Sequence, residues 1–281
     1  VKPDRLIATA PDCDRMGIAA KEGDGYQLIT GNEVGALLLE YICKSRVANG
    51  TMPKHPVSVK TIVTSTIIDA IGKEYGVEII DVLTGFKYIG EQVGLLEAKG
   101  EEDRFIFGFE ESYGYNAGSY VRDKDGVVAS MLICEMAAYY KEKGMTVVDA
   151  LRALYEKYDN YLSRQTSFYC EGASGMQRMA DIMAGLRKDP PKEIGGFAVQ
   201  EYADYQLSFK KDAKTGQERK VDLPKSNVLG YTLENGASVI VRPSGTEPKI
   251  KTYYTIVAPT MEEAEALHAT IAAATNKLLG F

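Results

Sequence analysis

The sequence predicts an α/β protein with two domains, and three observations lead to this. Short apolar strands alternate with helical segments between residues 57 and 109, and such alternation favours a largely parallel sheet covered by helices. The 281 residues exceed the roughly 100–200 that one domain usually holds. The composition changes near Asp159, so the second domain is expected to follow that residue.

The N-terminal segment is expected to form a strand, a hairpin and a long helix. Residues 6–9 are a short apolar run, and residues 17–20 and 26–29 have the pattern of a hairpin. Thr30 and Glu33 form a capping-box pair, which marks the start of a helix. Apolar residues then recur at i, i+3, i+4 and i+7, so one face of this helix should be buried.

The alternating elements follow a turn-rich stretch that ends at Pro53. Strands are expected over 57–63, 77–83 and 104–109, and helices over 67–75, 87–99, 127–143 and 146–158. Gly144 ends the first of the two long helices, and Thr146 with Asp149 caps the second. Together these elements make up the predicted parallel α/β unit.

The last part of the chain is expected to contain hairpins and two helices. Asn235-Gly236 is a strong turn signal between two strands. Three elements are expected around it: a helix over 174–187 with Met176, Met179, Met183 and Leu186 on one face, a strand over 250–257, and a helix capped by Thr260 and Glu263. The charged segment 210–225 is expected to be an exposed loop.

Charge and composition disfavour several classes of partner. Lys and Arg total 33 against 39 Asp and Glu, so nucleic acid is not expected, because phosphate backbones require a clustered basic surface. No apolar run approaches the roughly 20 residues of a membrane helix, so no membrane partner is expected and a cytoplasmic location is predicted. The four cysteines are widely spaced, so reduced thiols in the cytoplasm are expected rather than a disulfide scaffold or a zinc knuckle. They are Cys13, Cys43, Cys134 and Cys170.

Two polar loops could hold a cation and a phosphate. Asp12 and Asp14 are two residues apart in an extended loop, so both carboxylates can meet one hard cation such as Mg²⁺, with Arg15 beside them. Arg122 and Lys124 lie beside a predicted helix start, where they can bind phosphate or tune proton transfer. Taken alone, the first loop fits ordinary surface charge better than a cation site, and the second fits an acidic helix cap with flanking surface charges better than a phosphate site.

Two further loops suit a sugar and a second phosphate. Glu110 and Ser112 share a face just after a strand and can hydrogen-bond vicinal hydroxyls, although a polar turn has the same pattern. The loop 242–248 provides a guanidinium, two hydroxyls and an open backbone for a phosphate dianion, from Arg242, Ser244, Thr246 and Gly245. Together the four loops suit a phosphosugar with one phosphate anchored and another transferred.

These segments resemble, in the right order, the signature loops of the α-D-phosphohexomutases. The segments are Pro11-Asp12-Cys13-Asp14-Arg15, Gly108–Tyr115, Arg122-Asp123-Lys124-Asp125-Gly126 and Arg242–Pro248. The most similar branch is bacterial phosphoglucomutase/phosphomannomutase, including its phosphopentomutase-like relatives. The resemblance covers essentially the whole chain.

The resemblance implies that the chain is the C-terminal part of a four-domain enzyme. Residues 1–45 resemble the end of the second domain, 46–160 the third, a three-layer α/β domain with the sugar-binding loop, and 161–281 the fourth. The fourth is a smaller α+β domain of TATA-binding-protein-like topology with the phosphate-binding loop. The catalytic phosphoserine loop, of the Thr-Ala-Ser-His-Asn-Pro type, does not occur in this sequence. The missing N-terminal domains of the same protein are therefore an expected partner.

The implied activity is that of an isomerase of carbohydrate metabolism that works by phosphotransfer. A phosphoserine gives its phosphoryl group to a hexose 1-phosphate, the bisphosphorylated sugar turns over, and the serine recovers the other phosphoryl group to leave hexose 6-phosphate. Mg²⁺ neutralises the charge that develops on the phosphoserine, and glucose 1,6-bisphosphate is the implied activator. Because the serine is missing, this chain is expected to be inactive alone.

The resemblance also assigns roles to residues of this sequence. Arg15 corresponds to the family's arginine on the phosphoserine side of the site, and Lys124 to its active-site lysine. Asp12 and Asp14 correspond to two of its metal ligands. Substrate-binding positions are implied in four loops: Thr84, Gly85 and Lys87; Glu110 and Ser112; Arg122; and Arg242, Ser244, Gly245 and Thr246.

One position departs from the pattern of the family. Ala10 stands where the first acid of the Asp-x-Asp-x-Asp-Arg metal triplet is expected, so one ligand and one negative charge are lost. Mg²⁺ dehydrates reluctantly and demands near-ideal geometry. Weak or absent metal binding is therefore expected for this chain.

The sequence leaves other functions open. A non-catalytic sugar-phosphate binding module would lack the serine domain and fits the loss of the acid at Ala10. A metal-dependent sugar phosphatase would use Asp12 or Asp14 as its nucleophile. Phosphomannomutase or phosphopentomutase specificity also stays open, because Glu110 and Ser112 would bind hydroxyls that several sugars share.

Overall fold

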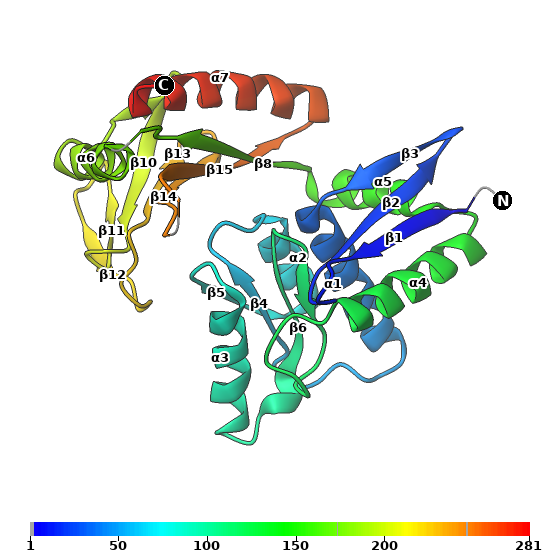
Figure 1. Cartoon of the computed structure of the whole chain (residues 1–281). Helices are drawn as coiled ribbons and strands as arrows, with labels where there is room; N and C mark the ends of the chain where they lie inside the picture. The colour runs from blue at the N-terminus through cyan, green and yellow to red at the C-terminus, as the bar shows by residue number, and fades with distance from the viewer. Residues whose placement is uncertain (1–2, 173, 246) are drawn as a thin grey trace. The chain divides into compact units, whose positions relative to one another are not determined.

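The computed structural model describes residues 3–172, 174–245 and 247–281. They fall into two compact units, Val1–Asp159 and Asn160–Phe281 (Figure 1). The division follows Asp159, where the composition of the sequence changes. The stretch 1–45 is part of the first unit, and each unit is described by itself below.

The first unit begins with a three-stranded antiparallel sheet in the order β1-β2-β3. Its strands are β1 (Arg5–Thr9), β2 (Met16–Glu22) and β3 (Gly25–Ile29), which confirms the predicted strand and hairpin. Helix α1 (Gly31–Ala48) follows and starts at the predicted capping box. The Thr30 amide donates to Glu33 Oε2 at 2.7 Å, and the Glu33 amide donates to Thr30 Oγ1 at 3.3 Å. Two amides of the helix start are thereby satisfied.

The second sheet of this unit is the predicted, largely parallel one. Strand β4 lies between β5 and β6 and is parallel to both, whereas β7 is antiparallel to β6. The strands are β4 (Val57–Thr61), β5 (Glu78–Val82), β6 (Phe105–Glu110) and β7 (Gly114–Asn116). Every residue of β4 and β6 is buried, as expected for strands covered on both faces.

Helices cover both faces of this second sheet. The helices after α1 are α2 (Ile67–Tyr75), α3 (Phe86–Glu97), α4 (Gly126–Glu142) and α5 (Val147–Tyr158), with a 3₁₀ turn, Glu102–Arg104, before β6. Helices α2, α3 and α4 contact strands of this sheet, whereas α5 packs against β2 of the first sheet. Phe109 of β6 packs against α1 at Gly35, while its neighbour Gly108 faces Ile89 of α3. Adjacent residues of a strand point to opposite faces, so α1 and α3 enclose the sheet in three layers.

The second unit is an antiparallel sheet with two helices. Its main strand order is β12-β11-β10-β13-β14-β15-β8, and β9 pairs with β10. The elements are β8 (Asn160–Tyr169), α6 (Gly175–Lys188), β9 (Glu193–Ile194), β10 (Phe197–Asp204), β11 (Phe209–Asp212), β12 (Glu218–Lys220), β13 (Leu229–Leu233), β14 (Ser238–Pro243), β15 (Lys249–Ala258) and α7 (Met261–Leu279). Both helices share one core with the central strands, to which Met183, Val239, Ile256 and Ile271 belong.

Two local predictions for this unit were wrong. The segment 210–225 is not only a loop, because it contributes to β11 and forms β12, with Lys211 Nζ 3.2 Å from Glu218 Oε1 across the pair. Charged residues can occupy such strands because both lie at the outer end of the sheet. Met176 is 53% exposed, whereas Met183 is 1% exposed. The prediction for Met176 relied on helical spacing alone. Spacing does not show that a residue in the first turn of α6 is exposed.

His268 on α7 should make the stability of the second unit depend on pH. Its ring lies edge-on to Tyr254, with 5.1 Å between centroids, and its buried Nε2 has no hydrogen-bond partner among the described residues. Burial lowers the pKa of His268 below its usual 6.5. The unfolded chain therefore binds a proton at higher pH than the folded chain, so the free energy of unfolding should decrease as the pH falls through about 6.5.

We expect His268→Gln, which has no proton to gain, to lack this contribution. The difference in unfolding free energy between the two proteins should shift in favour of the variant as the pH falls from about 7.5 to about 5. Urea unfolding at a series of pH values measures that difference. A constant difference across the series would show that burial does not perturb His268.

None of the helices in the described part of the chain combines the length and the apolar character needed to cross a membrane.

Candidate functional site

Backbone hydrogen bonds hold together three loops of the first unit that were predicted to carry function. The Gly126 amide donates to the Cys13 carbonyl oxygen at 3.0 Å, and the Met16 amide donates to the Tyr113 carbonyl oxygen at 3.1 Å. Cys13 and Tyr113 have positive φ angles of 56° and 69°, which residues other than glycine rarely adopt. The segment after β1 thus lies against the loop after β6 and the start of α4.

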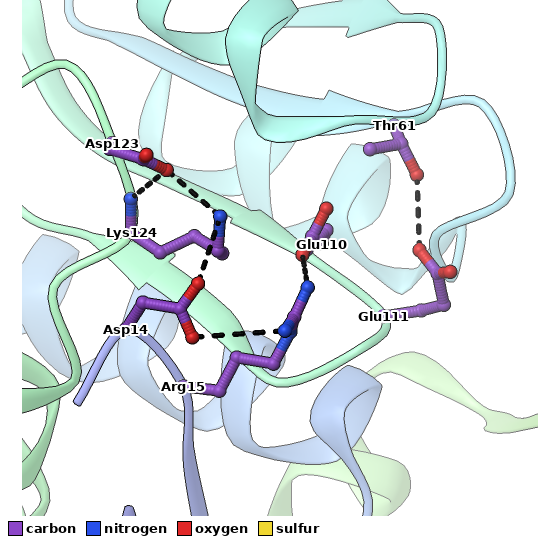
Figure 2. Close-up of polar contacts among 7 residues, drawn as sticks. All are labelled: Asp14, Arg15, Thr61, Glu110, Glu111, Asp123 and Lys124. Carbon is purple, nitrogen blue, oxygen red and sulfur yellow. Dashed lines mark hydrogen bonds and ion pairs between the residues drawn. The ribbon is translucent and has the colours of Figure 1, made fainter. Parts of the chain in front are cut away.

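This contact gathers charged side chains from distant parts of the sequence (Figure 2). Arg15 Nη2 lies 3.6 Å from Glu110 Oε1, and Arg15 Nη1 lies 3.7 Å from Asp14 Oδ1. Lys124 Nζ lies 3.2 Å from Asp14 Oδ2 and 2.9 Å from Asp123 Oδ1. Lys124 is 12% exposed and Glu110 is 8% exposed, so each depends on its partners for the solvation it has lost. Asp14, Arg15, Glu110 and Lys124 are called the charge cluster below.

Lys124 is held in its protonated form. Burial acts to lower the pKa of Lys124, but hydrogen bonds to Asp123 and Asp14 outweigh it, and the pKa is raised above its usual 10.5. Burial likewise acts to raise the pKa of Asp123, and the hydrogen bonds from Lys124 instead bring it below its usual value. At neutral pH the ammonium is therefore a fixed cation with a proton to donate.

Gly114 allows the charge cluster to close. A Cβ atom at this position would lie 2.5 Å from Lys124 Cδ and 2.9 Å from Glu110 Oε1. Gly114 also forms an isolated β-bridge with Arg15. Any other residue would therefore push apart side chains that come from two loops.

The predicted loop Thr84–Lys87 reaches the cluster through Phe86. This residue begins α3 and is buried, and Lys124 Nζ lies 5.4 Å from the centre of its ring. Thr84 and Gly85, which directly precede it, are half-buried. The ammonium of Lys87 lies 4.8 Å from the centre of the Tyr88 ring. The cation–π contact thus ties this loop to Lys124.

Glu111, between the two predicted sugar-binding residues, is fixed from two sides. Thr61 Oγ1 at the end of β4 donates to Glu111 Oε2 at 3.4 Å (Figure 2). The Glu111 carbonyl oxygen lies so close to α1 that a Cβ on Gly31 would be 2.1 Å from it. Glu110 and the half-buried Ser112 therefore lie on a loop that β4 and α1 hold in place.

Arg122 makes its ion pair away from the cluster. Its guanidinium pairs with Glu97, the last residue of α3. The helix cap considered for this segment is present, because Asp125 Oδ1 accepts from the amides of Val127 and Val128 at 3.0 and 2.9 Å. A role for Arg122 in substrate binding stays a prediction.

The carboxylates near Ala10 do not complete a metal site. Asp12 is exposed, and Asp14 Oδ2 already faces the Lys124 ammonium. Asp14 Oδ1 is buried without a hydrogen-bond donor among the described residues, and the Arg15 guanidinium lies 3.7 Å from it. Within the described ranges, no three Asp, Glu, His or Cys side chains gather as metal ligands. A carboxylate whose two oxygens already face a guanidinium and an ammonium does not fit a resident Mg²⁺, so no chemical step is assigned to a metal.

In the second unit, the predicted phosphate loop connects β14 to β15. The Ser244 amide donates to the Lys249 carbonyl oxygen at 2.8 Å, and Ser244 Oγ accepts from the Glu247 amide at 3.3 Å. Gly245 is exposed, and Thr246 lies outside the described residues. Arg242 is half-buried near the end of β14.

Sequence reasoning missed several residues that shape the site. Phe86 and Gly114 touch predicted site residues, and Thr61 bonds to Glu111 between two of them, yet their own types carry no chemical signal. Their positions at strand ends and a helix start were one indication, and the inclusion of Gly114 in the segment Gly108–Tyr115 was another. Their roles depend on contacts between segments that lie far apart in the sequence.

Two domain models of one family match the chain. The phosphoglucomutase/phosphomannomutase alpha/beta/alpha domain III model matches residues 30–158, and the C-terminal domain model of the same family matches residues 197–274. A phosphoglucomutase of Staphylococcus aureus (strain MRSA252) is 36% identical over 270 residues, which are 95% of this chain and 48% of the relative. The chain thus spans about half the length of the curated relatives it matches.

Solved structures show the same fold. The phosphoglucomutase pp63/parafusin from Paramecium matches with a TM-score of 0.67 and 17% identity, over 99% of this chain and 45% of that one. A putative phosphomannomutase from Thermus thermophilus matches with a TM-score of 0.63 and 19% identity, over 100% and 47% of the two chains. The domain models cover most of this sequence, and both name one family. The chain therefore belongs to the phosphoglucomutase/phosphomannomutase family.

Proposed function

We propose that the whole protein interconverts hexose 1-phosphate and hexose 6-phosphate, and that this chain supplies side chains that bind the substrate. The charge cluster is the main support for this proposal. It combines the protonated Lys124, the half-exposed Arg15 and the buried Glu110 beside Ser112. An anionic phosphate suits the two cations, and sugar hydroxyls suit a carboxylate next to a serine.

Three members of the cluster are given a part in phosphoryl transfer. Arg15 binds two phosphoryl oxygens at once through its guanidinium. Glu110 accepts a hydrogen bond from a sugar hydroxyl and so orients the ring. Lys124 donates a proton to the ester oxygen that leaves as its bond to phosphorus breaks, and takes up the proton of the attacking hydroxyl in the reverse direction.

The phosphorylated nucleophile is proposed to lie in the half of the whole protein that corresponds to the part of the relatives this chain does not match. The sequence carries no serine loop of the kind the family resemblance implies, so this chain alone should not turn over substrate. Glucose 1,6-bisphosphate is proposed as the activator of the whole protein. An N-acetylphosphoglucosamine mutase from Aspergillus fumigatus that shares the fold, at 16% identity and a TM-score of 0.51, was solved with that compound. Mg²⁺ is proposed to bind this chain weakly, because Ala10 supplies no ligand.

The missing N-terminal domains are proposed to cover an open face of the β1–β3 sheet. Leu6, Ala19 and Leu28 lie in one row across the three strands, and Leu28 is 80% exposed. This sheet precedes residue 30, where the match to domain III begins. The relatives have about twice the length of this chain, and an apolar row of this kind suits burial by their additional domains.

Lys124→Met tests the proposed binding role of the cluster. Removal of the ammonium should weaken binding of glucose 1-phosphate by about tenfold, the effect of one charge-assisted hydrogen bond. Isothermal titration calorimetry measures this, with Lys99→Met as a matched control on an exposed lysine. Equal affinities of the two variants would mean that phosphosugar does not bind at the cluster.

Ala10 favours one alternative, a sugar-phosphate binding module without catalysis. The two functions differ in what happens when the N-terminal half of a relative is supplied. A mutase fragment should then gain turnover, whereas a binding module should not. If the chain alone released inorganic phosphate from a sugar phosphate, the result would instead indicate the sugar phosphatase.

A further inference from the structure

A pocket of the first unit lies far from the charge cluster. It has a volume of about 330 Å³ and is lined by residues from the start of β1, the end of β2, the last turns of α4 and the start of α5 (Figure 1). Sites for small molecules usually enclose about 300–1,000 Å³, so this volume suits a small ligand. The 17 residues of α4 span about 25 Å, with Lys124 just before the first of them and Lys141 of the pocket near the last. The pocket is therefore separate from the proposed phosphosugar site.

Arg5 supplies a guanidinium to this pocket. The register of β1 and β2 pairs Arg5 with the buried Ala20, so both side chains start on the face of the sheet that α4 and α5 contact. Arg5 is half-buried, and among the described residues its guanidinium has neither a hydrogen bond nor an ion pair. Such a group offers two parallel N–H donors to a carboxylate.

The charges around the pocket leave a surplus of cations. Lys141 Nζ lies 2.6 Å from Asp4 Oδ2, so these two charges neutralise each other. Lys21 is half-buried, and in the described part of the chain no carboxylate lies at ion-pair distance from its ammonium. The hydrogen bond from Lys141 lowers the pKa of Asp4, and the charges of Lys21 and Arg5 act in the same direction. Lys21 and Arg5 are thus close enough to act on one carboxylate, and neither has an acid of its own.

The helix side of the pocket is apolar. Ala137 and Val147 are buried and Met145 is half-buried, and all three line the pocket. An inorganic anion would leave this apolar side uncovered, whereas an uncharged hydrocarbon would leave the cations without a partner. A ligand that joins an anionic group to a hydrocarbon body satisfies both sides, because its apolar surface also gains by leaving water.

We propose that this pocket binds a small aliphatic carboxylate. The carboxylate accepts two hydrogen bonds from the Arg5 guanidinium and lies beside the Lys21 ammonium, while the hydrocarbon chain lies against Ala137, Met145 and Val147. No residue of the charge cluster lines the pocket, so this inference does not depend on the proposed function.

Hexanoate is the probe that tests the inference, and hexan-1-ol is its uncharged counterpart. In the chain labelled with [methyl-¹³C]methionine, hexanoate should shift the Met145 methyl resonance, which is identified by its absence from the spectrum of Met145→Leu. Arg5→Met should bind hexanoate about tenfold more weakly, because a charge-assisted hydrogen bond is lost, and should bind hexan-1-ol unchanged. Asp4→Asn should bind hexanoate more tightly, because it removes a like charge from the pocket. The control Lys99→Met should behave like the unsubstituted chain.

Three results would overturn the inference. The first is a Met145 resonance that hexanoate does not move, and the second is equal hexanoate affinity of Arg5→Met and the unsubstituted chain. The third is a shift that disappears in Lys124→Met, because hexanoate would then bind at the charge cluster. An unchanged response of Arg5→Met to hexan-1-ol shows that the pocket is still folded, so weaker hexanoate binding by this variant reports the lost guanidinium.

Discussion

Gly31→Ala is expected to destabilise the first unit by about 3 kcal/mol, as overpacking against rigid backbone does. The new Cβ would lie 2.1 Å from the Glu111 carbonyl oxygen and 2.9 Å from the Tyr113 nitrogen. Both atoms belong to the backbone of the loop that carries Glu110 and Ser112, so no side-chain rotation relieves the clash. Urea unfolding measures the loss of stability.

The same substitution should weaken binding of glucose 1-phosphate, because the loop has to move away from α1. Gly94→Ala in α3 is the matched control, since its Cβ would meet only Arg122 Nε at 4.0 Å. Alanine in that helix interior should be neutral or stabilise by up to about 1 kcal/mol. If Gly31→Ala unfolds like Gly94→Ala, the loop is not held against α1 as described.

Ala10→Asp is expected to create a usable Mg²⁺ site. The Ala10 amide donates to the Arg15 carbonyl oxygen at 3.0 Å, so position 10 lies at the base of the turn that carries Asp12 and Asp14. A third carboxylate there would add a ligand and a negative charge, which helps a metal ion to compete with the Arg15 guanidinium for Asp14 Oδ1. We expect Mg²⁺ affinity to rise at least about tenfold, or about 1.4 kcal/mol.

Titration with Mg²⁺, or with Mn²⁺ followed by electron paramagnetic resonance, measures this gain. Ala8→Asp is the control, because it adds the same charge two residues earlier on the exposed side of β1. A general effect of negative charge would raise the affinity of both variants equally, and that result would rule out position 10 as a ligand position.

Local patterns predicted the elements of this protein well. The capping boxes at Thr30 and Thr146 are both present, and each depends on residues only three apart. The alternation of strands and helices led to the parallel arrangement of β4, β5 and β6. Strands β8 and β10 were not predicted, because their residues alternate poorly between apolar and polar, and the neighbouring strands rather than the pattern define them.

The candidate site was only partly accessible from the sequence. Resemblance singled out Asp14, Arg15, Glu110 and Lys124, and the structure brings these four together. No sequence pattern indicated that Gly114 lets them meet, because that depends on the approach of Lys124 from another loop.

The most direct test is a ³¹P NMR spectrum of glucose 1-phosphate mixed with this chain and a trace of glucose 1,6-bisphosphate. We expect the glucose 1-phosphate resonance to broaden, because the sugar exchanges on and off the charge cluster, while no glucose 6-phosphate appears. A resonance that stays sharp would contradict binding. Accumulation of glucose 6-phosphate would contradict the claim that the phosphorylated nucleophile lies outside this chain.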